Sequence, residues 1–155
     1  MRHKALAVSY FFSFSLLAIT GEELSLHTAA VARNIARTQH QQWLMQYHVI
    51  GTAIMENMLP QGIRAVFIRT LANHLSVALP SRREFNVKNL NYMALLATQY
   101  RRNELEQSKM APLPWSHVVL LICTVQKKEM REKLAAIADT DGWPLTKLWE
   151  KINEG

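Results

Sequence analysis

Apolar residues recur every three or four positions along nearly all of the chain from Leu24 onward, which is the spacing of one helix face. Proline-containing segments interrupt this pattern at 59–62, 79–80 and 111–114. Proline breaks helices because it lacks an N–H and its ring clashes with the preceding turn. No stretch shows the sustained alternation of a half-buried strand. The pattern therefore predicts an all-α, multi-helix domain.

Six helices are expected along the chain. Gly51 lies inside the first as a weak point or a close-packing site. Asn86 has the chemistry of an N-cap, because its side chain can accept a hydrogen bond from the next turn. The run at 118–125 is assigned to a helix, although its composition also suits a strand. The expected helices span Leu24–Met58, Ile63–Leu79, Val87–Tyr100, Trp115–Val125, Lys127–Ala138 and Leu145–Ile152.

Spacing also predicts which side of the third helix is buried. Its apolar positions form one stripe, and the preceding helix carries a matching set. We expect Val87, Leu90, Met93, Ala94 and Ala97 to pack against Val66, Phe67 and Leu71.

The first 21 residues differ from the rest. Arg2, His3 and Lys4 precede the uncharged run 5–20, a pattern typical of a secretory signal peptide. The run is short for a membrane span, and a buried helix or a non-native extension would also explain it. The prediction is therefore an apolar extension or signal-like segment at 1–21 and a helical domain at 22–155. A cytoplasmic location is expected, with export or membrane association through residues 5–20 as the alternative.

Positive charge is concentrated in the middle of the chain. The whole sequence has 18 Lys and Arg against 12 Asp and Glu, a net charge of +6. Between Pro60 and Met110 eight basic residues face three acidic ones, which gives this segment +5. Such a balance favours polyanionic partners.

Within this basic segment, two helices joined by a short connection outline a helix-turn-helix core. The second helix of that motif lies in the DNA major groove, with its first residues towards the bases. Arginines in the connection can hold phosphates, and asparagines can pair with adenine. In the alternative interpretation, the basic face is solvated or packs on a partner protein. The predicted DNA-binding residues are Arg82, Arg83, Lys88, Asn89, Asn91 and Tyr92.

The same helices resemble a known family. Phe-Asn-Val-Lys-Asn-Leu-Asn-Tyr-Met at 85–93 is similar to the Gly-Phe-Ser-x-Arg-Asn-Leu-x-Tyr-Met run in the N-terminal domain of YhcG-type PDDEXK nucleases. The resemblance implies a helical, helix-turn-helix-like DNA-binding module, normally followed by a metal-dependent nuclease domain. Further segments that match the family lie at 46–54, 62–72, 79–80, 94–100, 113–121 and 141–153.

Several polar positions depart from the family pattern while the apolar frame is kept. Glu84 and Asn86 stand where the family has Gly and Ser, and Lys88 replaces its Arg. His48 replaces a Trp of the first helix, and Val118 replaces an Asn. These changes indicate a diverged copy, so DNA binding is expected to be weak and dominated by phosphates.

The catalytic residues of a PDDEXK nuclease are missing from the sequence. Such an enzyme needs carboxylates that hold Mg²⁺ and a Glu-x-Lys or Asp-x-Lys unit, and neither unit occurs. Asp139 and Asp141 are expected in a turn, and Cys123 in an apolar run as a buried thiol. We therefore expect no enzymatic activity, cofactor, metal or small-molecule substrate. The expected partners are duplex DNA and, in addition, a nuclease domain supplied in trans or a second copy of the chain.

The purified chain is expected not to cut DNA, because it lacks the Glu-x-Lys unit. The measurement is the conversion of supercoiled plasmid in Mg²⁺ and Mn²⁺. Metal-dependent cleavage that co-elutes with the protein through every column would contradict this prediction.

Overall fold

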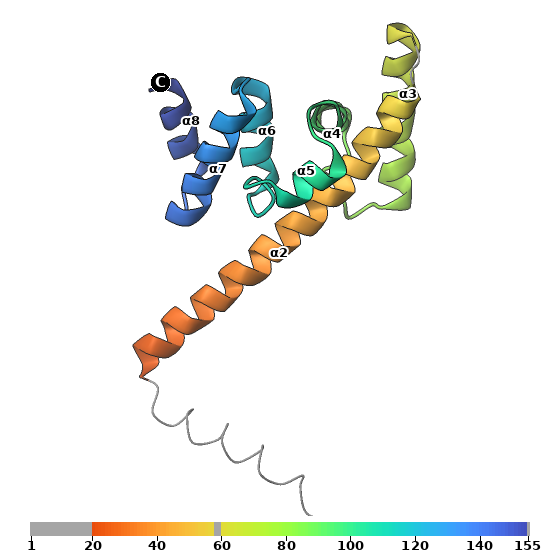
Figure 1. Cartoon of the computed structure of the whole chain (residues 1–155). Helices are drawn as coiled ribbons and strands as arrows, with labels where there is room; N and C mark the ends of the chain where they lie inside the picture. The colour runs from red at the N-terminus through yellow and green to blue at the C-terminus, as the bar shows by residue number, and fades with distance from the viewer. Residues whose placement is uncertain (1–19, 58–59, 155) are drawn as a thin grey trace, which may run out of the picture. The chain divides into compact units, whose positions relative to one another are not determined.

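The computed structural model describes residues 20–57 and 60–154, which form helices and their connections (Figure 1). No strand occurs within these ranges, so the all-α, multi-helix prediction is confirmed. All of the signal-like run 5–20 except Thr20 lies outside the described residues. The helices are α2 (Gly21–Glu56), α3 (Gln61–Ala78), α4 (Val87–Gln99), α5 (Arg102–Gln107), α6 (Trp115–Thr124), α7 (Lys128–Asp141) and α8 (Leu145–Asn153).

The chain divides into two compact units, residues 1–36 and 37–155. The described part of the first unit is the beginning of α2, where Thr20 and Glu23 cap the helix reciprocally. Its side chains are exposed, including Ile35, which the helical spacing places on the apolar face. None of the helices described here combines the length and apolar content that crossing a membrane requires.

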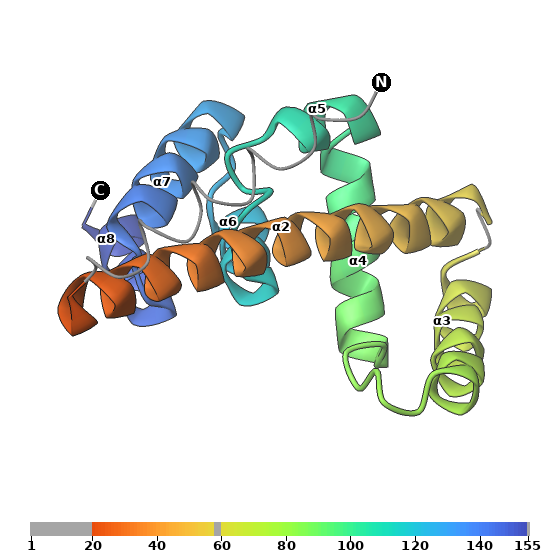
Figure 2. The same cartoon turned by 90° about the horizontal axis from the view of Figure 1, so that it is seen from below.

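In the second unit, α2 crosses α4 at Gly51 (Figure 2). A Cβ atom built on Gly51 would lie 2.5 Å from the carbonyl carbon of Met93 and nearer still to its oxygen. The two backbones therefore approach more closely than any residue with a side chain allows. Gly51 is the close-packing site that the sequence left as one of two alternatives.

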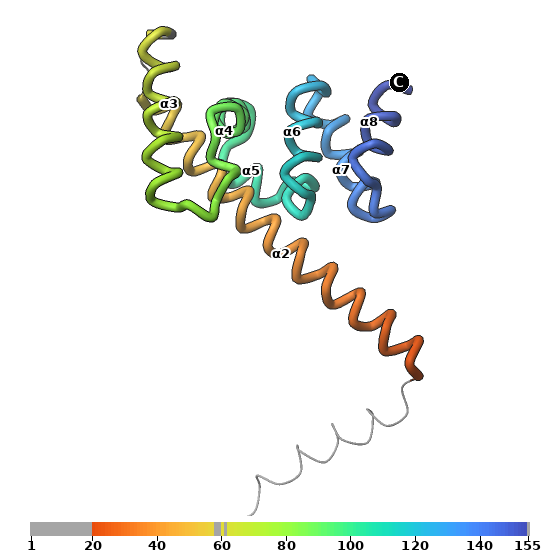
Figure 3. Tube along the Cα trace, turned by 180° about the vertical axis from the view of Figure 1, so that it is seen from behind, coloured from red at the N-terminus to blue at the C-terminus, as the bar shows by residue number. Residues whose placement is uncertain are grey.

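Two apolar clusters meet at this crossing. α4 contributes Leu96 to one cluster, while Leu90 and Met93 belong to the other. α2 likewise contributes Leu44 to the first and Tyr47 to the second. The first cluster continues into α6, α7 and α8, which lie side by side in Figures 1 and 3. The crossing of α2 and α4 thus joins the two halves of the core.

The predicted buried stripe of α4 is correct in its centre and wrong at its edge. Leu90, Met93 and Ala94 are buried as expected. Val87 is 42% exposed, and its expected partner Val66 is 59% exposed. The buried arc of α4 is shifted because the helix packs on α2 and α6 as well as on α3.

One helix of the structure was not predicted, and another continues past its predicted end. α5 was missed because its six residues bury only Leu105, which leaves no apolar period to detect. α7 continues through Asp139 to Asp141, where a turn was expected. The helix ends there because Gly142 adopts the left-handed conformation, with φ of 62°.

Gly51→Ala is expected to destabilise the protein by about 1–3 kcal/mol or more, because the new methyl group overlaps the Met93 carbonyl. The matched control is Gly62→Ala in α3, where a Cβ would meet no atom within 4 Å. The control should be unchanged or more stable by up to about 1 kcal/mol, since alanine favours helix. Urea unfolding followed by circular dichroism measures both. Equal stability of the two variants would contradict the close approach.

Candidate nucleic-acid interface

α3 and α4 form the pair that the sequence predicts as a helix-turn-helix. Figure 1 looks along α4 while α3 lies in its plane, so the two helices cross steeply. Their connection, residues 79–86, has eight residues, whereas the usual helix-turn-helix turn has about three or four. Asn86 caps α4 as predicted, because its side chain accepts from the Asn89 N–H at 2.9 Å. The helix pair and its cap agree with the prediction, whereas the connection is longer than the turn of a helix-turn-helix motif.

Arg82, the first predicted phosphate ligand, is committed to internal interactions. Its guanidinium pairs with Glu84, donates to Gln46 of α2 at 3.0 Å and lies 4.9 Å from the Phe85 ring centroid. The hydrogen bond with Glu84 raises the pKa of Arg82, and burial, followed by Glu84, raises the pKa of the neighbouring Tyr47. Arg82 therefore ties the connection to α2, and its charge is largely neutralised.

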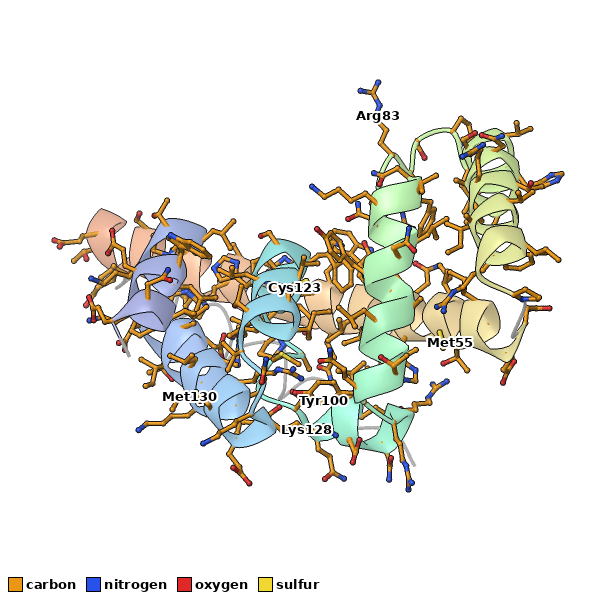
Figure 4. The ribbon with its side chains drawn as sticks, turned by 90° about the horizontal axis from the view of Figure 1, so that it is seen from above. Met55, Arg83, Tyr100, Cys123, Lys128 and Met130 are labelled. Carbon is orange, nitrogen blue, oxygen red and sulfur yellow. The ribbon has the colours of Figure 1, made fainter. Side chains whose placement is uncertain are left out.

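Arg83 and Lys88, in contrast, project from the surface. The Arg83 side chain extends away from the protein at the start of α4 (Figure 4). Lys88 is exposed, with its ammonium 6.0 Å from the Tyr92 ring centroid. Neither forms an ion pair with any described residue. Both charges are available to a polyanion.

The two predicted asparagine readers face different ways. Asn89 and Asn91 are two positions apart, which turns their side chains about 200° around the helix axis. Asn89 is half-buried and accepts from the Trp115 indole N–H at 3.3 Å, towards α6. Asn91 is exposed and donates to the Val87 carbonyl oxygen at 2.9 Å. Of the two, only Asn91 shares a surface with exposed Lys88.

Two basic residues of α3 were not among the predicted DNA-binding residues. Arg64 and Arg69 line a hollow of about 500 Å³ between α3 and α4, opposite Asn91 and Thr98. Ala65 and Ile68 lie between them on the same face of α3. The spacing of small and apolar residues flanked by arginines is visible in the sequence. Only the packing shows that this face of α3 lies opposite α4.

The expectation that Cys123 is buried is wrong. The residue is exposed on α6 and borders a second hollow beside α4, together with Gln99 and Arg131. Partial burial of the thiol nevertheless raises its pKa, against a smaller effect of Arg131. The thiol is therefore protonated at neutral pH, a state that disfavours nucleophilic chemistry.

Asp139, His48 and His117 form polar contacts within the fold. Asp139 is helical and forms a bidentate ion pair with Arg37, with Nη2–Oδ2 at 2.7 Å, so its assignment to a turn is wrong. Buried His48 hydrogen-bonds the Tyr100 carbonyl oxygen at 2.7 Å, and His117 that of Trp143 at 2.8 Å. Within residues 20–57 and 60–154, no three His, Cys, Asp or Glu side chains gather as metal ligands would.

Comparison with known proteins gives one family. Residues 25–155 match the sequence model of the DUF1016 N-terminal domain. The chain belongs to this family. DUF1016 is the family of the YhcG-type proteins, so the resemblance is confirmed. No curated protein and no solved structure matches the chain.

Three of the departures of this DUF1016 domain from the family pattern, at Glu84, Asn86 and His48, have structural partners. Glu84 pairs with Arg82, and Asn86 supplies the cap that a serine can also supply. His48, at the position of a tryptophan, replaces apolar contact with a buried hydrogen bond to the end of α4. These three residues therefore stabilise α4 and its connections to the rest of the fold.

Replacing Arg82 and Arg83 separates their roles. Arg82→Gln is expected to lower the free energy of unfolding by about 1–2 kcal/mol, because charge-assisted hydrogen bonds to Glu84 and Gln46 are lost. Arg83→Gln, the matched control, should change it by less than about 0.5 kcal/mol. Urea midpoints of both variants give the answer, and identical midpoints would show that Arg82 adds nothing to the fold.

Proposed function

We propose that this DUF1016 domain is a DNA-binding module of helix-turn-helix type, without a catalytic site of its own. The observation that carries the proposal is the unneutralised positive surface of α3, α4 and their connection. The two helices contain Arg64, Arg69 and Lys88 and neither Asp nor Glu. The connection adds exposed Arg83, while its one carboxylate, Glu84, is paired with Arg82. A duplex with its dense phosphate charge is the polyanion that such a surface suits.

The side chains then divide into two roles. Arg83 and Lys88 bind phosphates, and Asn91 and Tyr92 of the same helix face towards base edges. Arg82 and Asn89 orient α4 through Gln46 and Trp115 and make at most secondary DNA contacts. Because Arg82 and Asn89 are held by Gln46 and Trp115 of other helices, four of the six predicted residues remain for DNA, and the expected affinity is low and dominated by phosphates.

The module acts with chemistry supplied elsewhere. The family resemblance points to a nuclease domain that DNA binding would bring to its substrate, as another part of the protein or as a separate chain. The absence of a Glu-x-Lys unit from this sequence supports a separate catalytic domain. A cytoplasmic location is part of the proposal, since the partner is DNA.

A protein-interaction module is the second candidate function. Leu24, Val31 and Ile35 are 51%, 44% and 65% exposed on the first part of α2. Exposed apolar side chains at such spacing suit a helical partner or a second copy of this chain. Unlike phosphate contacts, an apolar interface depends little on salt.

Salt dependence tests the DNA proposal. Each phosphate contact contributes about 0.9 to the slope of log K against log salt. Arg83→Ala with Lys88→Ala is therefore expected to weaken binding to duplexes of every sequence and to reduce the slope by about 2. Fluorescence anisotropy with a labelled duplex over a salt series measures it.

The control variant is Lys109→Ala with Lys133→Ala. It removes the same charge from two exposed lysines outside α3, α4 and their connection. Its slope should stay close to that of the wild type. A slope that falls equally in both variants would assign binding to overall charge, and an absence of binding at low salt would overturn the proposal.

A further inference from the structure

The hollow between α3 and α4 has the size of a small-ligand site. Its volume of about 500 Å³ lies in the usual range of about 300–1,000 Å³. Met55, at the end of α2, lies on the side of α4 where α3 packs (Figure 4). We call this hollow the α3–α4 groove; its lining residues are Met55, Arg64, Ala65, Ile68, Arg69, Val87, Asn91, Leu95 and Thr98.

Two arginines give the α3–α4 groove an unbalanced positive charge. Arg64 donates to the sulfur of Met55 at 2.8 Å, which holds its guanidinium at the groove. No described residue pairs with Arg64 or Arg69 as a salt bridge, and none of the nine lining residues is acidic. The planar, always charged guanidinium can bind a phosphate with two donors and can stack on a base.

The apolar and uncharged polar residues of the groove suit the base of a ligand, whereas the arginines suit its phosphate. Leu95, Val87 and Ala65 supply accessible apolar surface, while Ile68, also in the lining, is only 2% exposed. Asn91 and Thr98 already donate to the carbonyls of Val87 and Leu95, at 2.9 and 2.6 Å, so their side-chain oxygens are left as acceptors. The groove thus offers cations for a phosphate, an apolar floor for a planar ring and acceptors for amino groups on that ring.

We propose that the α3–α4 groove binds one unpaired nucleotide of a DNA strand. A phosphate alone would leave the apolar floor unused, and an apolar ligand would leave two cations unpaired. Bases in an intact duplex are stacked inside it, so only an unpaired or extruded nucleotide can reach such a floor. The inference rests on the proposed DNA binding and adds that the preferred substrate is DNA with an unpaired position.

Anisotropy titrations with two duplexes test this inference. One duplex is fully paired, and the other has the same sequence with one extra unpaired nucleotide. The wild type should bind the second about tenfold more tightly, as expected from the burial of one base. Arg64→Gln with Arg69→Gln should reduce this preference to less than about twofold. The loss of two charges weakens binding to both duplexes equally, so it does not change the ratio of the two affinities.

The charge-matched control, Lys109→Gln with Lys133→Gln, should keep the preference. A second measurement does not depend on the folding of a variant: a 5′-phosphorylated thymidine dinucleotide should shift the amide resonances of Ala65, Ile68 and Thr98 in the wild type. Equal affinity for the two duplexes without such shifts would overturn the inference and leave the proposed function intact. If neither duplex binds, the proposed function fails, and the dinucleotide shifts alone decide whether the groove is a nucleotide site.

Discussion

The close approach of α2 to α4 at Gly51 and Met93 is the contact on which the second unit depends. It places one long helix against the helix that belongs to both apolar clusters. Because interiors are packed at nearly crystalline density, a shift of this crossing would be transmitted to both clusters. The position and direction of α4, and with them the candidate interface, follow from a residue that has no side chain.

Polar contacts then fix which face of α4 is exposed to solvent. Arg82 links the connection before α4 to Gln46 of α2, Trp115 of α6 donates to Asn89, and His48 bonds the carbonyl after α4. Two of these bonds use Arg82 and Asn89, which the sequence alone assigns to DNA. What remains for a partner is the opposite side of the helix, where Lys88 and Asn91 have no acidic neighbour among the groove-lining residues. One face of α4 therefore holds the contacts to the rest of the fold, and another face forms the candidate interface.

The sequence predicted most of the fold, whereas the packing decided which polar residues of the candidate site are exposed. Helical spacing located six of the helices, and the N-cap at Asn86 was correct because capping depends on neighbours three residues away. α5 was missed since a six-residue helix with one buried residue has no period. Among the site residues, the sequence could not separate Arg82 from Arg83, because adjacent residues of the same type differ only in which partner lies across the fold.

Local physics thus determined the helical class, the breaks at proline, the cap at Asn86 and the excess of positive charge, and the resemblance of the sequence motifs indicated the DUF1016 family. Tertiary structure alone decided that Gly51 is a crossing point, that Cys123 is exposed and that Arg64 and Arg69 face Asn91 across a groove. These features depend on contacts between residues tens of positions apart. A periodic pattern in the sequence predicts one helix and its apolar side. Which neighbouring helix covers that side depends on the packing of all the helices together.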